Sequence, residues 1–304
     1  ALDNAQLYTE VEEMNAAYAR FVPRQFLQHL NKHSITEVSL GDQVQVEMSV
    51  LFADIRAFTT LSETLSPQAN FNFINDYLAC MEPVIVDHGG FIDKYIGDAI
   101  MALFSGAADD ALAGGIAMQR ALEAYNVRRQ AQGHSPIRIG IGINTGSLML
   151  GTVGGPNRMD STVISDSVNL AARLEELTKT YGVSFLIGHP TYERLRYPQH
   201  HCIRKIGRVK VKGKTRAVTV YEVFDGDPDA LKQSKLATLE DFQRGVDACD
   251  RGHWSEATAC FDHCRAIAPQ DPVVQYYLRH CQQAAAGLEA PLGSAPLEWD
   301  VGPL

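Results

Sequence analysis

The sequence predicts an α+β sandwich of ferredoxin-like character that is followed by a small all-α appendage. The spacing of apolar residues predicts the elements strand, helix, hairpin, helix and strand, followed by a helix and further strands. This is the order of elements in such a sandwich. The turn-rich stretch 225–229 then separates this part from a segment whose pattern is helical. Hydrophobic residues make up 45% of the 304 residues, which is enough for a globular core.

The first two elements follow from regular apolar spacing. Residues 43–52 alternate between apolar and polar, which predicts a half-buried strand whose apolar phase reaches Asp54. Residues 67–87 place apolar side chains at steps of four, which predicts a helix. Pro83 lies inside that helix, and we expect it to kink the helix or to shift its end, because proline has no N–H to donate.

A tight hairpin is expected next. Two apolar runs, 91–96 and 99–104, flank Gly97 and Asp98, and a glycine between such runs is typical of a hairpin turn. Asp98 would therefore lie at the tip. The remaining elements of the sandwich are expected as helices at 109–132 and 166–179 and as strands at 137–144, 183–187, 202–211 and 217–224.

We expect four parts along the chain. They are an N-terminal helical segment at 1–40, the α+β domain at 41–226, a helical segment at 230–286 that resembles a tetratricopeptide pair with a third helix, and an irregular tail at 287–304. Leu7, Val11, Met14, Tyr18 and Phe21 form a heptad-like seam in the first part. A parallel dimer helix and an amphipathic helix lying on its own domain explain this seam equally well.

Composition argues against several classes of function. The chain has 27 Lys and Arg against 36 Asp and Glu, a net charge of −9, which argues against general coating of nucleic acid. No apolar run approaches the roughly 20 residues of a membrane span. Six cysteines in a chain of this length indicate free thiols and a cytoplasmic protein. Because the first residue is Ala1, we expect a fragment that lacks an upstream regulatory domain.

Two aspartates carry the first candidate site. Asp54 is the next residue in the apolar alternation of its strand, and Asp98 lies at the tip of the hairpin. An ionised carboxylate on or near a buried face is costly unless it is paired or bound to a metal. Brought together, the two would repel, and a divalent cation with oxygen ligands, magnesium or manganese, would cancel that repulsion. Taken singly, each aspartate is better explained as a turn or cap residue.

Further patterns suit a ligand that bears phosphate. The N–H groups of the segment that includes Phe58 and Thr59, just after the first strand, can cradle phosphate. Asn169 and Arg173 are four apart and share one helix face, where an amide and a guanidinium suit a sugar oxygen and a phosphate. Cations alternate with other residues along 208–216. Singly, the helix pair is explained more simply as a solvated face and the basic run as a charged edge strand.

Four segments together resemble the catalytic domain of the class III nucleotidyl cyclases. They are Phe52 to Thr59, Lys94 to Ala99, Arg138 to Gly146 and Thr162 to Leu174, in the order that the family has them. The resemblance covers residues 45–225. It implies a ferredoxin-like core that works as a head-to-tail homodimer with its active sites at the interface. A threonine at position 162 resembles the bacterial and soluble group of the family.

The resemblance also implies a role for each matching residue. Asp54, Asp98 and the carbonyl of Ile55 would hold two Mg²⁺ or Mn²⁺ ions in one subunit. Asn169 of the partner subunit would orient the ribose, and Arg173 of the partner subunit would neutralise charge on the α-phosphate. The implied reaction is attack of the ribose 3′-OH of ATP on the α-phosphate, which gives cyclic AMP and pyrophosphate.

Further residues match positions that bind the phosphates and the base. Lys212 matches a phosphate-binding lysine, and Arg138 matches an arginine at the pyrophosphate end. Lys94 would donate to adenine N1, and Thr162 would face the exocyclic amine. An ammonium group has only donors, so Lys94 cannot accept the guanine N–H, and this favours ATP.

Other functions remain as alternatives. The presence of Lys94 argues against a guanylyl cyclase. A diguanylate cyclase is a further alternative, but the hairpin tip at 96–99 lacks the Gly-Gly-Asp/Glu-Glu-Phe motif of that class. A catalytically silent dimerisation or scaffold module, with the C-terminal helices as its binding surface, is the alternative from another class. The presence of the metal-binding and the ribose-binding residues in one chain argues against it and indicates two symmetric sites in a homodimer.

Overall fold

The computed structural model describes residues 11–14, 17–18, 22–155, 157–210 and 217–286. The described strands form one sheet in the order β2-β3-β1-β4-β6-β8-β7, and β5 pairs with β4 outside this path. They are β1 (Gln43–Ile55), β2 (Gly90–Ile96), β3 (Ala99–Phe104), β4 (Ile139–Gly155), β5 (Arg158–Ile164), β6 (Phe185–Gly188), β7 (Ile203–Lys210) and β8 (Ala217–Val223). The predicted α+β class is confirmed.

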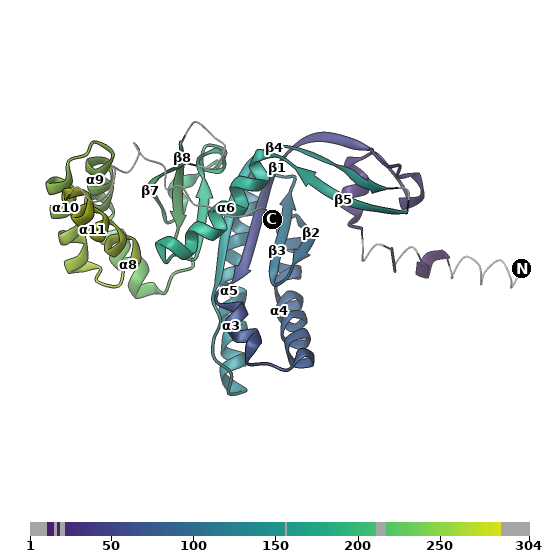
Figure 1. Cartoon of the computed structure of the whole chain (residues 1–304), viewed down its shortest axis with the longest axis horizontal. Helices are drawn as coiled ribbons and strands as arrows, with labels where there is room; N and C mark the ends of the chain where they lie inside the picture. The colour runs from purple at the N-terminus through teal and green to yellow at the C-terminus, as the bar shows by residue number, and fades with distance from the viewer. Residues whose placement is uncertain (1–10, 15–16, 19–21, 156, 211–216, 287–304) are drawn as a thin grey trace, which may run out of the picture.

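Helices cover the sheet and extend beyond it. They are α2 (Arg24–His29), α3 (Phe58–Glu63), α4 (Pro67–Asp87), α5 (Ala108–Ala131), α6 (Asp166–Tyr181), α7 (His189–Tyr192), α8 (Asp229–Ala237), α9 (Leu239–Asp250), α10 (Trp254–Ile267) and α11 (Pro272–Ala285). Figure 1 shows α4 and α5 beside β1, β2 and β3. Pro83 does not shift the end of α4, because the helix continues to Asp87, and the alternative that it kinks the helix stays a prediction. The carbonyl that loses its partner belongs to exposed Ala79, where water can replace the missing N–H.

The central strand β1 is buried on both faces over its second half. Leu51, Ala53 and Ile55 pack into the core under α4 and α5. Met48 and Val50 point to the other face, in a second cluster that includes α2. The prediction of a half-buried strand therefore holds only for the first few residues of β1, where the alternation between exposed and partly buried side chains is visible.

The strand β5 was not predicted, and β4 is longer than predicted. β4 continues through the Gly-rich stretch to Gly155, and it pairs with β5 as an antiparallel arm. Figure 1 shows this arm projecting from the body of the sheet. Most β5 side chains are exposed or half-buried. In a strand without a buried face, apolar and polar residues need not alternate, and this explains why β5 was not predicted from the sequence.

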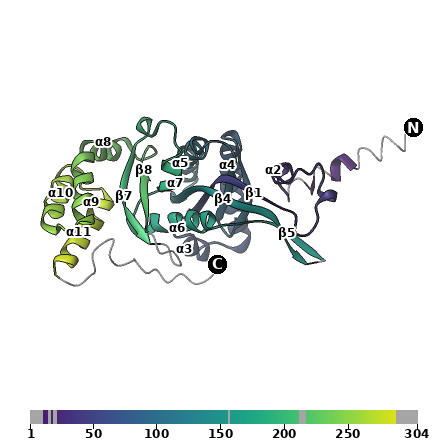
Figure 2. The same cartoon turned by 90° about the horizontal axis from the view of Figure 1, so that it is seen from above.

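The C-terminal helices share a core and a buried ion network with the sheet. Leucines of α6 pack in one apolar cluster with side chains of α9, α10 and α11. Arg204 on β7 lies 2.5 and 2.8 Å from the carboxylate oxygens of Asp271, which caps α11, and 2.6 Å from Glu222 on β8. Lys235 on α8 donates to Glu222 at 2.5 Å and to Asp227 at 2.6 Å. Figure 2 shows these helices beside β7 and β8.

The predicted N-terminal and C-terminal parts are only partly described. Residues 11–14 and 17–18 are helical, and α2 begins after Pro23, so the helical segment predicted at 1–40 is interrupted there. Val11, Met14 and Tyr18 are exposed, and their pairing with a second copy stays a prediction. The tail at 287–304 lies outside the described residues, and the tetratricopeptide likeness stays a prediction. Within the described part of the chain, no helix is long and apolar enough to cross a membrane.

Candidate active site

Asp54 and Asp98 lie close together at the end of β1 and at the turn between β2 and β3. Ala53 pairs with Ile100 across the two strands, which brings the residues beyond them to the same edge. Gly97 has a φ of 65°, which allows the tight turn before Asp98. Burial raises the pKa of Asp98 to about 7, and the negative charge of Asp54 and a hydrogen bond with it act in the same direction.

This acidic pair suits a hard divalent cation. The buried Oδ2 of Asp98 has no hydrogen-bond partner among the described residues, so the fold leaves one ligand oxygen unused. No group of three or more His, Cys, Asp or Glu side chains that could hold a metal occurs in the described part of the chain. Mg²⁺ is usually held by one or two carboxylates together with water and substrate phosphates, and Mn²⁺ accepts the same oxygen ligands. Asp54, Asp98 and the Ile55 carbonyl therefore fit Mg²⁺ or Mn²⁺ that binds with a nucleotide.

Two cations from neighbouring elements surround the acidic pair. Lys179 of α6 places Nζ 2.9 Å from Oδ2 of Asp54 and 4.0 Å from Oε1 of Glu175. Arg56, two residues after Asp54, lies 3.4 Å from the same Glu175 carboxylate. Burial raises the pKa of Glu175 to about 7 despite the nearby Lys179. The site is therefore a mixed cluster of acids and bases.

Two glycines of β4 allow α6 to approach this cluster. A Cβ on Gly142 would lie 2.2 Å from the backbone nitrogen of Glu175, which no side chain can do without moving the helix. A Cβ on Gly140 would lie 2.2 Å from the guanidinium of Arg56. Gly140 also pairs with Asp54 across the sheet. The alternating glycines thus explain why side chains of α6 reach the end of β1.

The residues expected to bind the phosphates lie at the same end of β1. The backbone N–H of Arg56 donates to the carbonyl of Arg138 at 2.8 Å, and the Arg138 side chain is exposed. Phe58 begins α3, stacks on Phe73 of α4 with ring centroids 6.3 Å apart, and precedes exposed Thr59. The structure therefore brings Arg138, Phe58 and Thr59 near the acidic pair.

The two residues expected to select the base come together on β2 and β5. Lys94 donates from Nζ to the carbonyl of Ser161 at 3.3 Å, and Thr162 is the next residue. Lys94 also lies 3.4 Å from Asp93, whose side chain is only 2% exposed. The lysine is thereby held beside Thr162, although these residues are 68 positions apart in the sequence.

The amide and guanidinium of α6 lie nearer the start of the helix than Lys179, which contacts the acidic pair. Asn169 lies ten residues before Lys179, which is about 15 Å along a helix axis. Arg173 donates to Glu176 at 3.1 Å, and its side chain is 13% exposed. Lys212 lies outside the described residues.

Sequence reasoning missed the ions that surround the aspartates. Glu175 and Lys179 are four residues apart on α6, and this spacing was the one local signal for their pairing. Apart from its position in the hairpin, nothing in the sequence indicated that Asp93 would be buried beside Lys94. Long-range contacts such as that between Lys179 and Asp54 cannot be read from spacing in the sequence.

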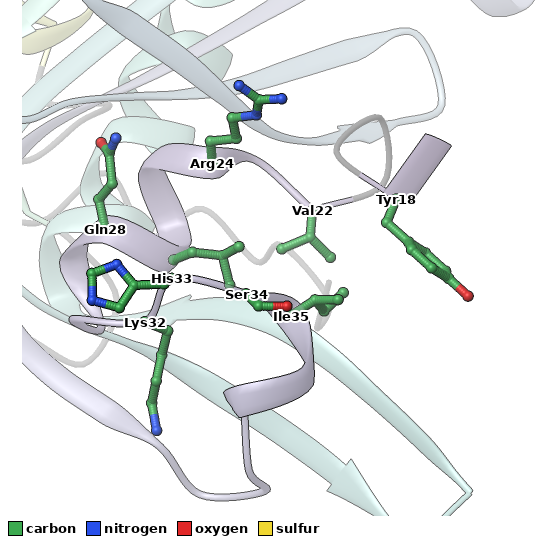
Figure 3. Close-up of a pocket in the computed structure, with 9 residues that line it drawn as sticks. Tyr18, Val22, Arg24, Gln28, Lys32, His33, Ser34 and Ile35 are labelled. Carbon is green, nitrogen blue, oxygen red and sulfur yellow. The ribbon is translucent and has the colours of Figure 1, made fainter. Parts of the chain in front are cut away.

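A pocket in the N-terminal part contains none of the predicted site residues. It has a volume of about 420 Å³ and is shown in Figure 3. The side chains that line it are Tyr18, Val22, Arg24, Leu27, Gln28, Lys32, His33, Ser34 and Ile35. It is therefore separate from the acidic pair.

Comparisons with known proteins agree with the motifs. Residues 40–223 match the family model described as the adenylate and guanylate cyclase catalytic domain. An adenylate cyclase of Anabaena cylindrica is 45% identical over 237 residues, which are 71% of this chain and 47% of that protein. A terminal-differentiation specific adenylate cyclase of Dictyostelium discoideum is 37% identical over 285 residues, 92% of this chain and 13% of that protein. The crystal structure of the adenylyl cyclase CyaB from P. aeruginosa has a TM-score of 0.54 at 37% identity, and the match covers 60% of this chain and 96% of that one.

The fold, the motifs and these matches define a domain of the nucleotidyl cyclase class. The chain belongs to the adenylate and guanylate cyclase catalytic domain family. The resemblance drawn from the four sequence motifs is thereby confirmed. The chain spans less than half the length of either curated relative.

Proposed function

We propose that this chain carries the catalytic domain of an adenylyl cyclase, which converts ATP to 3′,5′-cyclic AMP and pyrophosphate. The observation that carries the proposal is the pairing of Asp54 with Asp98, where one buried carboxylate oxygen has no partner among the described residues. Such a pair is costly unless a cation joins it. The similarity to proteins named adenylate cyclase supports the same activity.

The acidic pair would hold two Mg²⁺ or Mn²⁺ ions together with the triphosphate. When bound, these ions lower the pKa of the ribose 3′-OH and offset the negative charge of the phosphates. Asp54, Asp98 and the Ile55 carbonyl supply the ligands. The 3′-OH would release its proton to water as its oxygen forms a bond to the α-phosphorus. The bond between the α-phosphorus and the oxygen that bridges to the β-phosphate breaks, and pyrophosphate leaves with that electron pair. Arg138 and Lys212 would bind the leaving pyrophosphate.

We propose that a second copy of the chain completes each site. Within one chain Asn169 lies about 15 Å along α6 from Lys179, which contacts Asp54. Asn169 of the partner subunit would orient the ribose, and the partner subunit's Arg173 would stabilise negative charge on the α-phosphate in the transition state. The Thr162 strand leads directly into α6, so the base site and this pair would come from one subunit.

Lys94 and Thr162 would select adenine. The Lys94 ammonium can donate to adenine N1, and it has no lone pair to accept the guanine N–H. Asp93 beside it is buried, and burial raises the pKa of that carboxyl. The position of Lys94 next to the Thr162 strand supports ATP as the substrate and argues against the guanylyl alternative.

The first test is the choice of nucleotide. We expect the protein to form cyclic AMP from ATP with Mg²⁺ or Mn²⁺ and to use GTP poorly. Lys94→Glu is expected to lower kcat/KM for ATP about 10- to 100-fold, because a hydrogen bond from a charged donor contributes about 1.5–3 kcal/mol. Chromatography of both cyclic products measures the effect. Lys205→Met, which removes a cation paired with α9, is the control. Equal use of ATP and GTP by the unaltered protein would contradict the assignment of the base site.

The free thiols support the expected cellular location. All six cysteines are unpaired, including Cys249 and Cys281, whose sulfur atoms lie 3.6 Å apart in the core. Thiols this close would be expected to oxidise in a secreted protein. We therefore propose a reducing compartment such as the cytoplasm.

A further inference from the structure

Lys179 occupies a position that no motif of the sequence assigns to the reaction. Its Nζ lies 2.9 Å from Oδ2 of Asp54, on the carboxylate that would bind metal. It comes from the last turn of α6, whose approach to the sheet depends on the glycines of β4. The lysine therefore supplies a positive charge at the place where two carboxylates meet.

This ion pair is not needed to hold the fold together. The Lys179 side chain is 48% exposed, and exposed ion pairs contribute little to stability. Arg56 behaves differently, because its side chain is 15% exposed and contacts both Glu175 and the carbonyl of Val183. A lysine carries a compact charge on a flexible chain, so Lys179 can leave Asp54 without disturbing α6.

The carboxylate of Glu175 can pair with Lys179 when Lys179 leaves Asp54. Oε1 of Glu175 already lies 4.0 Å from the Lys179 Nζ, one helical turn before it. Movement of the ammonium toward Glu175 would release Oδ2 of Asp54 and keep the positive charge paired. Both positions lie on α6 or directly against it, so a change of side-chain rotamer is enough.

We propose that Lys179 is a tethered counter-ion that neutralises Asp54 until a divalent cation displaces it, and that it thereby sets the metal concentration at which the site fills. This inference rests on the proposed function, because it takes Asp54 and Asp98 as the metal ligands. Lys179 is a positioning residue here, since it acts through Asp54. Because a divalent ion has twice the charge of the lysine ammonium, it displaces the flexible Lys179 side chain from Asp54.

The test is a titration of the full chain with Mn²⁺ in the absence of nucleotide. Isothermal titration calorimetry measures the heat of binding, and electron paramagnetic resonance measures the concentration of free Mn²⁺. Lys179→Met is expected to bind Mn²⁺ about tenfold more tightly, because a competing positive charge within about 4 Å is gone. Lys179→Arg keeps the charge and is expected to retain the affinity of the unaltered protein within about twofold. Lys205→Met removes a lysine that is 24% exposed and pairs with Asp247 and Asp250 away from the acidic pair, and it should leave the Mn²⁺ affinity unchanged.

Thermal unfolding supplies a second readout. Without metal, the Tm of Lys179→Met is expected to stay close to that of the unaltered protein, because the exposed ion pair contributes little to stability. The rise of its Tm on addition of Mn²⁺ is expected to exceed that of the unaltered protein. Mn²⁺ affinity of Lys179→Met that equals or falls below that of the unaltered protein would overturn the inference. Asp54→Ala separates the two proposals. If it binds Mn²⁺ unchanged, the metal site itself is wrong; if it loses Mn²⁺ while Lys179→Met behaves normally, only the role of Lys179 fails.

Discussion

Replacing Asp98 by asparagine is expected to lower the rate of cyclic AMP formation by about a thousandfold or more. Metal ions at such sites contribute several kcal/mol to stabilisation of the transition state, and each 1.36 kcal/mol corresponds to a factor of about ten in rate. An amide has the shape of the carboxyl group but lacks its charge, so the ligand set loses one of its two negative groups. The measurement is kcat with saturating ATP and Mn²⁺.

The stability of the same variant distinguishes a metal ligand from a structural residue. Burial and the charge of Asp54 raise the pKa of Asp98 to about 7, so above that pH the carboxyl is ionised and the metal-free fold is destabilised by its buried charge. Asp98→Asn is therefore expected to unfold at the same or a higher temperature than the unaltered protein at pH 8 without metal. Asp247→Asn, at an exposed position on α9, is the control. A lower Tm together with retained activity would contradict the metal role of Asp98.

Replacing Asp271 by alanine is expected to cause the largest loss of stability among single substitutions in the C-terminal helices. Asp271 is fully buried, accepts from the N–H of Val273 as the N-cap of α11, and holds Arg204 with both carboxylate oxygens. Its removal leaves the buried Arg204 guanidinium without the carboxylate that binds it through two oxygens. Breaking a buried pair in this way costs about 3–5 kcal/mol.

Urea unfolding followed by circular dichroism measures this loss. The midpoint for Asp271→Ala is expected to fall far below that of Asp262→Ala, whose carboxylate pairs with Arg265 at the surface of α10. Exposed pairs of that kind contribute about 0–1 kcal/mol. If both variants unfold at the same urea concentration, the network that joins the C-terminal helices to β7 and β8 does not stabilise the fold.

Local patterns in the sequence predicted the elements that carry the site. The hairpin tip at Asp98 was predictable because a glycine between two apolar runs allows few other conformations. The face shared by Asn169 and Arg173 followed from helical spacing. Asp54 and Asp98 were singled out by their places at a strand end and a hairpin tip, whereas the Ile55 carbonyl and the base-selecting pair were named from a resemblance to a family.

The features that sequence reasoning missed depend on contacts between distant residues. Arg204 and Asp271 meet only after the C-terminal helices dock on the sheet, and neither residue belongs to a recognisable motif. Lys179 reaches Asp54 because Gly140 and Gly142 let α6 approach, which no local pattern records. The β5 arm was missed because it has no buried face.

Co-expression of two inactive variants in one cell tests most directly whether each active site draws its parts from two chains. One variant carries Asp54→Ala and Asp98→Ala, the other carries Asn169→Ala and Arg173→Ala, and different affinity tags allow each species to be isolated. Each variant alone is expected to be inactive, whereas equal amounts of both should recover about a quarter of the normal cyclic AMP rate, because half of the dimers then contain one complete site. Isolated mixed dimers that remain inactive, or substantial activity of either variant alone, would contradict the shared site.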